Sequence, residues 1–295
     1  MTTLAPQFDA EFLRKLERLE WLTRRRLRGQ TRGEQRSRAQ GRSIELFDYR
    51  AYQHGDDLRY IDWNLYSRLD QLFVKLFAAE EDLTLYLLID ASASMALGQP
   101  SKVDYTRRLA AALAYIGLAH FERVGVSTFR AGLIQTSPLM RGRANIMHLL
   151  QFLGSLSATG KTSLEMAISD FAASSRKPGM VIVLSDFLDV GDIKHCLSSL
   201  RSQRHDAVML QILAEDDIAP PLAGDLQLVD SEHQSSIRVS LDEALRNTYE
   251  QAVLSHVDAL ARHCLSAGIG YARTSTSVPF EDLVLKHMRT GQLLK

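Results

Sequence analysis

Five oxygen-bearing side chains stand in three separated segments, and their spacing fits a site for a hard metal ion. Asp90, Ser92 and Ser94 alternate with alanines directly after an apolar run, so a turning loop can direct all three side chains toward one point. Thr162 precedes a later helical segment, and Asp186 follows a second apolar run. Oxygen donors without histidine or cysteine favour Mg²⁺, Mn²⁺ or Ca²⁺ over Zn²⁺. These residues therefore predict a divalent metal site.

The two carboxylates of this set are expected to face each other across a crevice. In an open doubly wound sheet, ligands bind beyond the carboxyl ends of the strands, where the strand order reverses. Asp90 ends the expected strand 83–89 and Asp186 follows the expected strand 180–184, so the strand order 3-2-1-4-5-6 makes these two strands neighbours. Two anions brought together need a cation or a shared proton. Asp189 is a weaker alternative to Asp186.

The segment G-K-T-S that contains Thr162 imitates the end of a nucleotide-binding P-loop. That pattern requires a glycine five residues before Gly160, where Ser155 stands, and Gly154 lies one position too early. It also requires a strand before the loop, whereas a helical pattern leads into this one. The sequence therefore argues against nucleotide binding and leaves the Thr162 hydroxyl to the metal site.

Strand and helix patterns alternate after residue 82, which predicts an α/β fold with a doubly wound, mostly parallel sheet. Apolar runs indicate strands at 83–89, 124–129, 180–184, 207–213 and 269–273. Helical patterns cover 101–121, 144–156, 164–174, 192–201 and 241–265. Residues 215–240 break the alternation and predict an inserted loop or β-hairpin, to which the sequence assigns no task.

The first 80 residues differ from the rest in composition and in the pattern of apolar residues. Residues 8–28 place apolar side chains at helical spacing, and residues 14–42 hold eleven Lys or Arg against three Glu. One interpretation of this basic arm is a docking element for an acidic surface, RNA or lipid phosphate. The other, slightly favoured, is a solvated helix face followed by a linker.

A β extension is expected after the arm, with short half-buried strands at 44–47 and 72–76. The charged residues between these strands favour structural ion pairs that pin the segment to a neighbouring domain over an acid/base pair. These residues are Asp56, Asp57, Arg59 and Asp62.

The composition is that of an average soluble globular protein, with 45% hydrophobic and 24% charged residues among 295. The 35 basic and 35 acidic side chains cancel, which removes any argument for DNA binding from bulk charge. Cys196 and Cys264 lack partners at metal-ligand spacing and suit a reducing compartment. No segment has the pattern of a signal peptide or a membrane span. We therefore expect a cytoplasmic protein without a transmembrane segment.

Three loop sequences resemble the metal-ion-dependent adhesion site of von Willebrand factor type A domains. They are D-A-S-A-S-M after an apolar strand, G-K-T-S-L before a helix and V-L-S-D after a later strand. The resemblance implies that Ser92 and Ser94 ligate the metal directly and Thr162 does so directly or through water. It also implies that Asp90 and Asp186 hold the ion partly through water, with one position left for a carboxylate of a protein partner.

The upstream stretch I-E-L-F-D-Y-R-A-Y-Q-H-G-D-D-L-R-Y-I-D-W-N resembles the bacterial family named domain of unknown function fifty-eight. Its members resemble partners of MoxR-type AAA+ ATPases. The resemblance implies a metal-dependent protein-binding module or adaptor that works with such an ATPase in the assembly or maturation of protein complexes. The expected organisation is a basic helical arm and linker (1–43), a β extension (44–80) and a von Willebrand factor A-like domain (81–295).

Two alternative functions stay open. A metal-dependent hydrolase would use the metal to activate water, but no His-Asp-Ser or Cys-His order is evident, and His54 is the first histidine to test. RNA binding through the basic arm is the other, although the arm has no aromatic residue beyond Trp21. A non-enzymatic module with no catalytic residues is therefore favoured.

Overall fold

A computed structural model describes most of the chain as two compact units. The described residues are 8–30, 46–77, 84–120, 123–175, 177–188, 191, 193–232 and 235–289. The larger unit comprises residues 1–27 and 83–295, and the smaller comprises residues 28–82.

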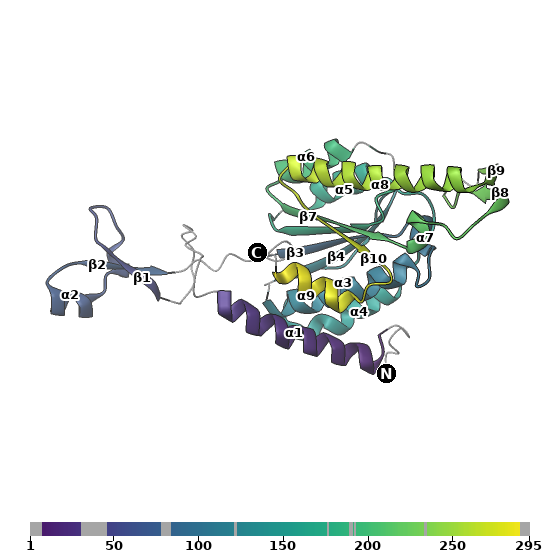
Figure 1. Cartoon of the computed structure of the whole chain (residues 1–295). Helices are drawn as coiled ribbons and strands as arrows, with labels where there is room; N and C mark the ends of the chain where they lie inside the picture. Colours follow the sequence, from purple (N-terminus) through teal and green to yellow (C-terminus); the bar gives the residue numbers. More distant parts are fainter. Residues whose placement is uncertain are drawn as a thin grey trace. The chain divides into compact units, whose positions relative to one another are not determined.

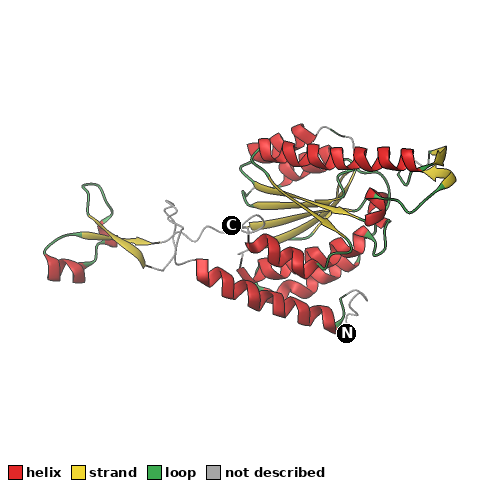
Figure 2. Ribbon diagram, in the orientation of Figure 1, coloured by secondary structure: helices red, strands yellow, loops and turns green. Residues whose placement is uncertain are grey.

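A six-stranded sheet forms the centre of the larger unit (Figures 1 and 2). Its strands are β3 (Thr84–Asp90), β4 (Arg123–Arg130), β5 (Gly132–Thr136), β6 (Met180–Ser185), β7 (Asp206–Leu213) and β10 (Gly270–Ser275). Their spatial order is β10-β7-β6-β3-β4-β5, and only β5 runs antiparallel to its neighbour. Numbered along the chain, this is the order 3-2-1-4-5-6, so the predicted fold class is confirmed.

Helices cover both faces of this sheet (Figure 2). One face carries α1 (Ala10–Gln30), α3 (Lys102–His120), α4 (Ile146–Gly154) and α9 (Phe280–Arg289). The other carries α5 (Leu164–Ser174), α6 (Ile193–Ser202) and α8 (Glu243–Ser266). Strand β3 explains why both faces need cover, because Leu85 and Leu87 enter one core while Tyr86 and Leu88 enter the other. This is the pattern expected for a strand of a buried parallel sheet.

The helix α1 belongs to the larger unit, whereas the sequence analysis set residues 1–43 apart as an arm. Its apolar stripe is buried, and the Phe12 and Phe280 ring centroids lie 5.5 Å apart. Lys15 adds an exposed ion pair to Glu281, with 3.2 Å between Nζ and Oε1. Burial of each large apolar side chain contributes about 1.5–3 kcal/mol. This contribution holds α1 on the larger unit although its other face is basic and solvated. The polar part of the predicted arm, residues 31–42, lies outside the described residues.

The smaller unit is an antiparallel β-ribbon with helical turns in its connection. Its elements are β1 (Leu46–Ala51), a 3₁₀ turn (Leu58–Tyr60), α2 (Trp63–Leu69) and β2 (Phe73–Phe77). Asp62 organises this unit: it caps α2 by accepting from the amides of Asn64 and Leu65, and it accepts from the Tyr49 hydroxyl at 3.0 Å. Asp56 likewise pairs with Arg50 at 2.9 Å. These partners lie within the unit and not on a neighbouring domain, where the sequence analysis expected them, so the charged residues have a structural role inside the unit.

An insertion between β7 and α8 lies at the carboxyl end of the sheet (Figure 1). It consists of the short α7 (Glu215–Ile218) and a hairpin of β8 (Gly224–Val229) and β9 (Ser236–Leu241). The hairpin predicted for residues 215–240 is therefore present. None of the described helices has the length and apolar character needed to span a bilayer.

Candidate functional site

Asp90 and Asp186 meet at the carboxyl ends of the neighbouring strands β3 and β6. Ser185 connects them: its hydroxyl donates to Asp90 Oδ2 at 2.6 Å, and Asp186 is the next residue. The other Asp90 oxygen accepts from the Ser92 amide at 2.9 Å, which fixes the turn out of β3. Both aspartates are about 1% exposed. Both carboxylates therefore lie where the strand order reverses, as predicted, and both are buried there.

Ser92 and Ser94 converge on one side of this turn. Their hydroxyl oxygens lie 3.0 Å apart, within hydrogen-bonding distance. Ser92 is completely buried, whereas Ser94 is partly exposed. The alternation with alanine thus brings two hydroxyls together next to Asp90, as the spacing predicted.

The loop before Thr162 runs alongside the Asp90 loop. The Ala93 amide donates to the Gly160 carbonyl and the Thr159 amide donates to the Ala91 carbonyl, each at 2.9 Å. Gly160 has a φ of +78°, a conformation that suits glycine and that closes this turn. Thr162 follows two residues later and is partly buried. The structure therefore brings all three predicted loops to one edge of the sheet, while Asp189 lies outside the described residues.

A buried lysine, which the sequence analysis did not identify, neutralises part of the negative charge. Lys102, at the start of α3, is 0% exposed. Its Nζ lies 2.7 Å from Asp186 Oδ2 and 2.9 Å from Asp217 Oδ2. Burial opposes the charged ammonium, but the two carboxylates outweigh it and raise the pKa of Lys102 above its usual range. Lys102 therefore stays charged and ties α7 to the site.

The charge at this edge is still unbalanced. Asp90, Asp186 and Asp217 can carry three negative charges against the single positive charge of Lys102. Burial, followed by the nearby Asp186 charge, raises the pKa of Asp90 to about 7. A divalent cation beside Asp90 would oppose that shift, because it favours the ionised carboxylate.

A second unforeseen contact joins the insertion to the Thr162 loop. Glu232, in the turn of the β8–β9 hairpin, accepts a hydrogen bond from the Thr162 amide, with 3.0 Å between N and Oε2. The two residues are 70 positions apart in the chain. The pair has no sequence signal, because nothing in the local pattern of residues 215–240 specifies which loop the hairpin reaches.

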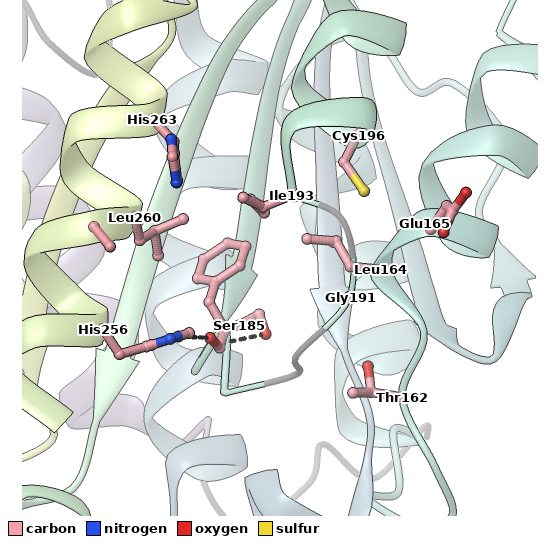
Figure 3. Close-up of a pocket in the computed structure, with 12 residues that line it drawn as sticks. Thr162, Leu164, Glu165, Ser185, Gly191, Ile193, Cys196, His256, Leu260 and His263 are labelled. Atoms are coloured by element: carbon pink, nitrogen blue, oxygen red, sulfur yellow. Dashed lines mark hydrogen bonds between the residues drawn. The ribbon is translucent and has the colours of Figure 1, made fainter. Parts of the chain in front are cut away.

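A cavity of about 230 Å³ lies beside the site, between the first turns of α5 and α6 and the carboxyl-terminal half of α8 (Figure 3). Thr162 and Ser185 belong to its lining, so it adjoins the candidate metal loops. Its walls are mainly apolar, with Leu164 and Leu260 among them. His256 borders it and bonds through Nε2 to the Phe187 carbonyl at 2.7 Å. This bond holds the loop after β6 against α8.

The strand order and the Asp-x-Ser-x-Ser turn at its reversal point define a von Willebrand factor type A-like domain. The chain belongs to the family described as "Protein of unknown function DUF58", whose model matches residues 48–259. The match spans more than half of the chain and includes both units. The family resemblance noted in the sequence is therefore confirmed.

The chain is also similar over most of its length to a relative and to two solved structures. An uncharacterized protein of Mycobacterium tuberculosis (strain ATCC 25618 / H37Rv) is 27% identical over 265 residues, covering 88% of this chain and 83% of the relative. The conserved hypothetical protein BatB from Bacteroides thetaiotaomicron is 17% identical with a TM-score of 0.47, covering 70% of this chain and 99% of BatB. The SpRpn10 VWA domain is 12% identical with a TM-score of 0.42, covering 70% of this chain and 94% of that domain.

Proposed function

We propose that this chain is a metal-dependent protein-binding module of the adhesion-site type. In this proposal, Asp90, Ser92, Ser94, Thr162 and Asp186 hold Mg²⁺, or Mn²⁺ or Ca²⁺ in its place, and a partner supplies an acidic residue to the ion. The metal contributes a positive charge that a partner's carboxylate can bind. The observation that carries the proposal is the meeting of Asp90 and Asp186, with incomplete charge compensation, beside two converging hydroxyls.

The residues at this edge fit a hard cation. Every candidate donor is an oxygen, which suits Mg²⁺, Mn²⁺ and Ca²⁺. Within the part of the chain that the structure describes, no three or more His, Cys, Asp or Glu side chains are grouped to hold a metal. A site here consequently depends on the hydroxyls of Ser92, Ser94 and Thr162 as well as on carboxylates. Neutral hydroxyl ligands offset less of the ion's charge than a set made of carboxylates alone, which favours an acidic ligand from a partner.

The family resemblance extends the proposal to the partner. We infer that the module acts as an adaptor for a MoxR-type AAA+ ATPase during assembly or maturation of protein complexes. The acidic residue that binds the metal then lies either on the ATPase or on the protein that the pair handles.

Metal binding is tested first, by isothermal titration of the full chain with Mn²⁺ and Mg²⁺. The variant Asp90→Ala should abolish binding, because it removes a carboxylate fixed by Ser92 and Ser185. The control is Asp258→Asn, which neutralises an exposed carboxylate on α8 and should bind like the unmodified chain. Equal affinity in Asp90→Ala and the unmodified chain contradicts the assignment of the site.

Partner binding is tested by co-purification with the MoxR-type ATPase of the same organism. The unmodified chain and Asp258→Asn should retain the ATPase in 5 mM Mg²⁺, which is at least 100 times any Kd of about 50 µM or less and so saturates such a site. Chelation and Asp90→Ala should each release it. Retention that neither treatment changes contradicts a metal-dependent contact.

A further inference from the structure

The insertion between β7 and α8 is attached to the candidate metal site by two carboxylates. At its start, Asp217 on α7 binds Lys102, with 2.9 Å between Oδ2 and Nζ. At the hairpin turn, Glu232 accepts from the Thr162 amide at 3.0 Å. Residues 215–241, which have no evident task in the sequence, therefore reach the site from two directions.

The hairpin turn presents Glu232 while most of the hairpin stays in solvent. All but three of the residues in β8 and β9 are exposed. Asp230 shapes the turn, because it accepts from the Glu232 amide at 2.7 Å and donates its own amide to the Ser235 carbonyl at 2.8 Å. Glu232 itself is partly buried. An exposed hairpin with a formed turn thus delivers one carboxylate to the Thr162 loop.

In the absence of a metal ion, the negative charges at this edge of the sheet disfavour the position of Glu232. Asp90, Asp186 and Asp217 lie at this edge, where the buried Lys102 contacts Asp186 and Asp217, and another carboxylate at the same edge adds to the repulsion. Arg130 also lies close to this loop, where its Nη1 donates to the Thr159 hydroxyl at 2.8 Å, and its partly exposed charge offsets part of this repulsion. Lys161 is exposed, and exposed charges in water compensate little. A divalent ion among the three loops would supply the missing attraction.

We propose that Glu232 is an internal carboxylate for this metal site, so that the β8–β9 hairpin occupies the position that a partner's acidic residue would take. This inference rests on the proposed function. Glu232 binds the metal-loaded site when no partner is present, and an acidic segment of the partner displaces it. A partner's acidic segment must therefore bind the metal-loaded site more favourably than Glu232 does.

The test uses the full chain and its variants Glu232→Gln, Asp225→Asn and Asp90→Ala. Asp225→Asn is the matched control, because it neutralises an exposed carboxylate on the same hairpin. Mn²⁺ affinity is measured by isothermal titration. Hydrogen exchange of the amides in residues 224–241 and of Thr162 is then compared with and without Mg²⁺.

Glu232→Gln should weaken Mn²⁺ binding about tenfold, the usual effect of losing a supporting group at a metal site. Asp225→Asn should bind like the unmodified chain. Added Mg²⁺ should slow exchange across the hairpin turn and at Thr162 in the unmodified chain and in Asp225→Asn, but not in Glu232→Gln.

Two results would overturn the inference. If Glu232→Gln binds Mn²⁺ as tightly as the unmodified chain, or if Mg²⁺ leaves hairpin exchange unchanged, Glu232 is a structural anchor of the Thr162 loop. When Asp90→Ala still abolishes Mn²⁺ binding in the same experiment, the proposed function survives and only this inference fails. If the unmodified chain binds no Mn²⁺, both fail together.

Discussion

Replacing Lys102 by methionine tests how the charges at the candidate site are balanced. Methionine keeps an unbranched apolar chain of similar length, so the main loss is the ammonium. That group is completely buried and contacts Asp186 and Asp217 at 2.7 and 2.9 Å. Without it, two carboxylates stay in a poorly solvated region and lose the counterion that the described residues provide.

The size of the effect follows from these distances. At an effective dielectric constant of about 20, each contact contributes about 6 kcal/mol of Coulomb attraction. Desolvation of the ammonium costs several kcal/mol, and the measured cost of breaking such buried pairs is about 3–5 kcal/mol. We expect Lys102→Met to lower the free energy of unfolding by that amount at pH 7. The melting temperature should then fall by about 10 °C for a chain of this size.

Urea denaturation at pH 7 measures the loss, with Lys15→Met as control. Lys15 forms its ion pair with Glu281 while 46% exposed, so its removal should cost about 0–1 kcal/mol. Because a divalent cation can replace the missing charge, 10 mM Mg²⁺ should restore more stability to Lys102→Met than to the unmodified chain. A loss no greater than that of Lys15→Met, with no added response to Mg²⁺, would refute this account. If Lys102→Met does not fold, Asp217→Asn should still show a smaller loss of the same origin.

Three further predictions concern the loops and the first helix. The folded-state pKa of Asp90, about 7, lies above its ordinary value of 3.8. Without metal, the stability that Asp90 contributes is therefore present below about pH 4 and is lost as pH rises through 7. Asp90→Asn should flatten this part of the plot of urea midpoint against pH, and an unchanged slope would count against the assignment. Gly160→Val should lower stability by about 1–2 kcal/mol, since a β-branched residue is strained at a φ of +78°, and should weaken Mn²⁺ binding in the titration. Phe12→Ala should cost about 3 kcal/mol and raise hydrogen exchange throughout α1, whereas Arg18→Ala, on the exposed face of α1, should change stability by less than about 0.5 kcal/mol.

Most of the sheet could be predicted because each buried strand corresponds to a short run of apolar residues in the sequence. The predicted strand 180–184 is β6 (Met180–Ser185), and the predicted helix 164–174 agrees with α5. The order 3-2-1-4-5-6 is the usual order of a doubly wound sheet, and it makes β3 and β6 neighbours only when β5 is counted. The antiparallel edge strand β5 was missed, since its five residues are partly exposed and lack a long apolar run. Helix α9 was missed as well, although it supplies Phe280 to the core.

The site residues that have a local sequence signal could be predicted, whereas those joined to the site only by long-range contacts could not. Asp90, Ser92 and Ser94 are close in sequence, so one turn brings them together and the pattern could be read directly. Thr162 and Asp186 could be added because each follows or precedes a recognisable element. The extent of the larger unit could not be predicted, because α1 is joined to it only by contacts with residues far along the chain.

Lys102 shows why residues that control a site can escape a search for chemical motifs. In the sequence it is an ordinary lysine at the beginning of a helix, next to Ser101, whose hydroxyl accepts from the Asp104 amide and donates to the Asp104 carboxylate. Its role comes from being buried between Asp186, which is 84 residues away, and Asp217, on an element that breaks the strand-helix alternation. Burial strengthens the electrostatic interactions of this ammonium, because the surrounding dielectric constant falls. A long-range buried ion pair therefore determines how much positive charge a metal must add, and only the folded chain reveals it.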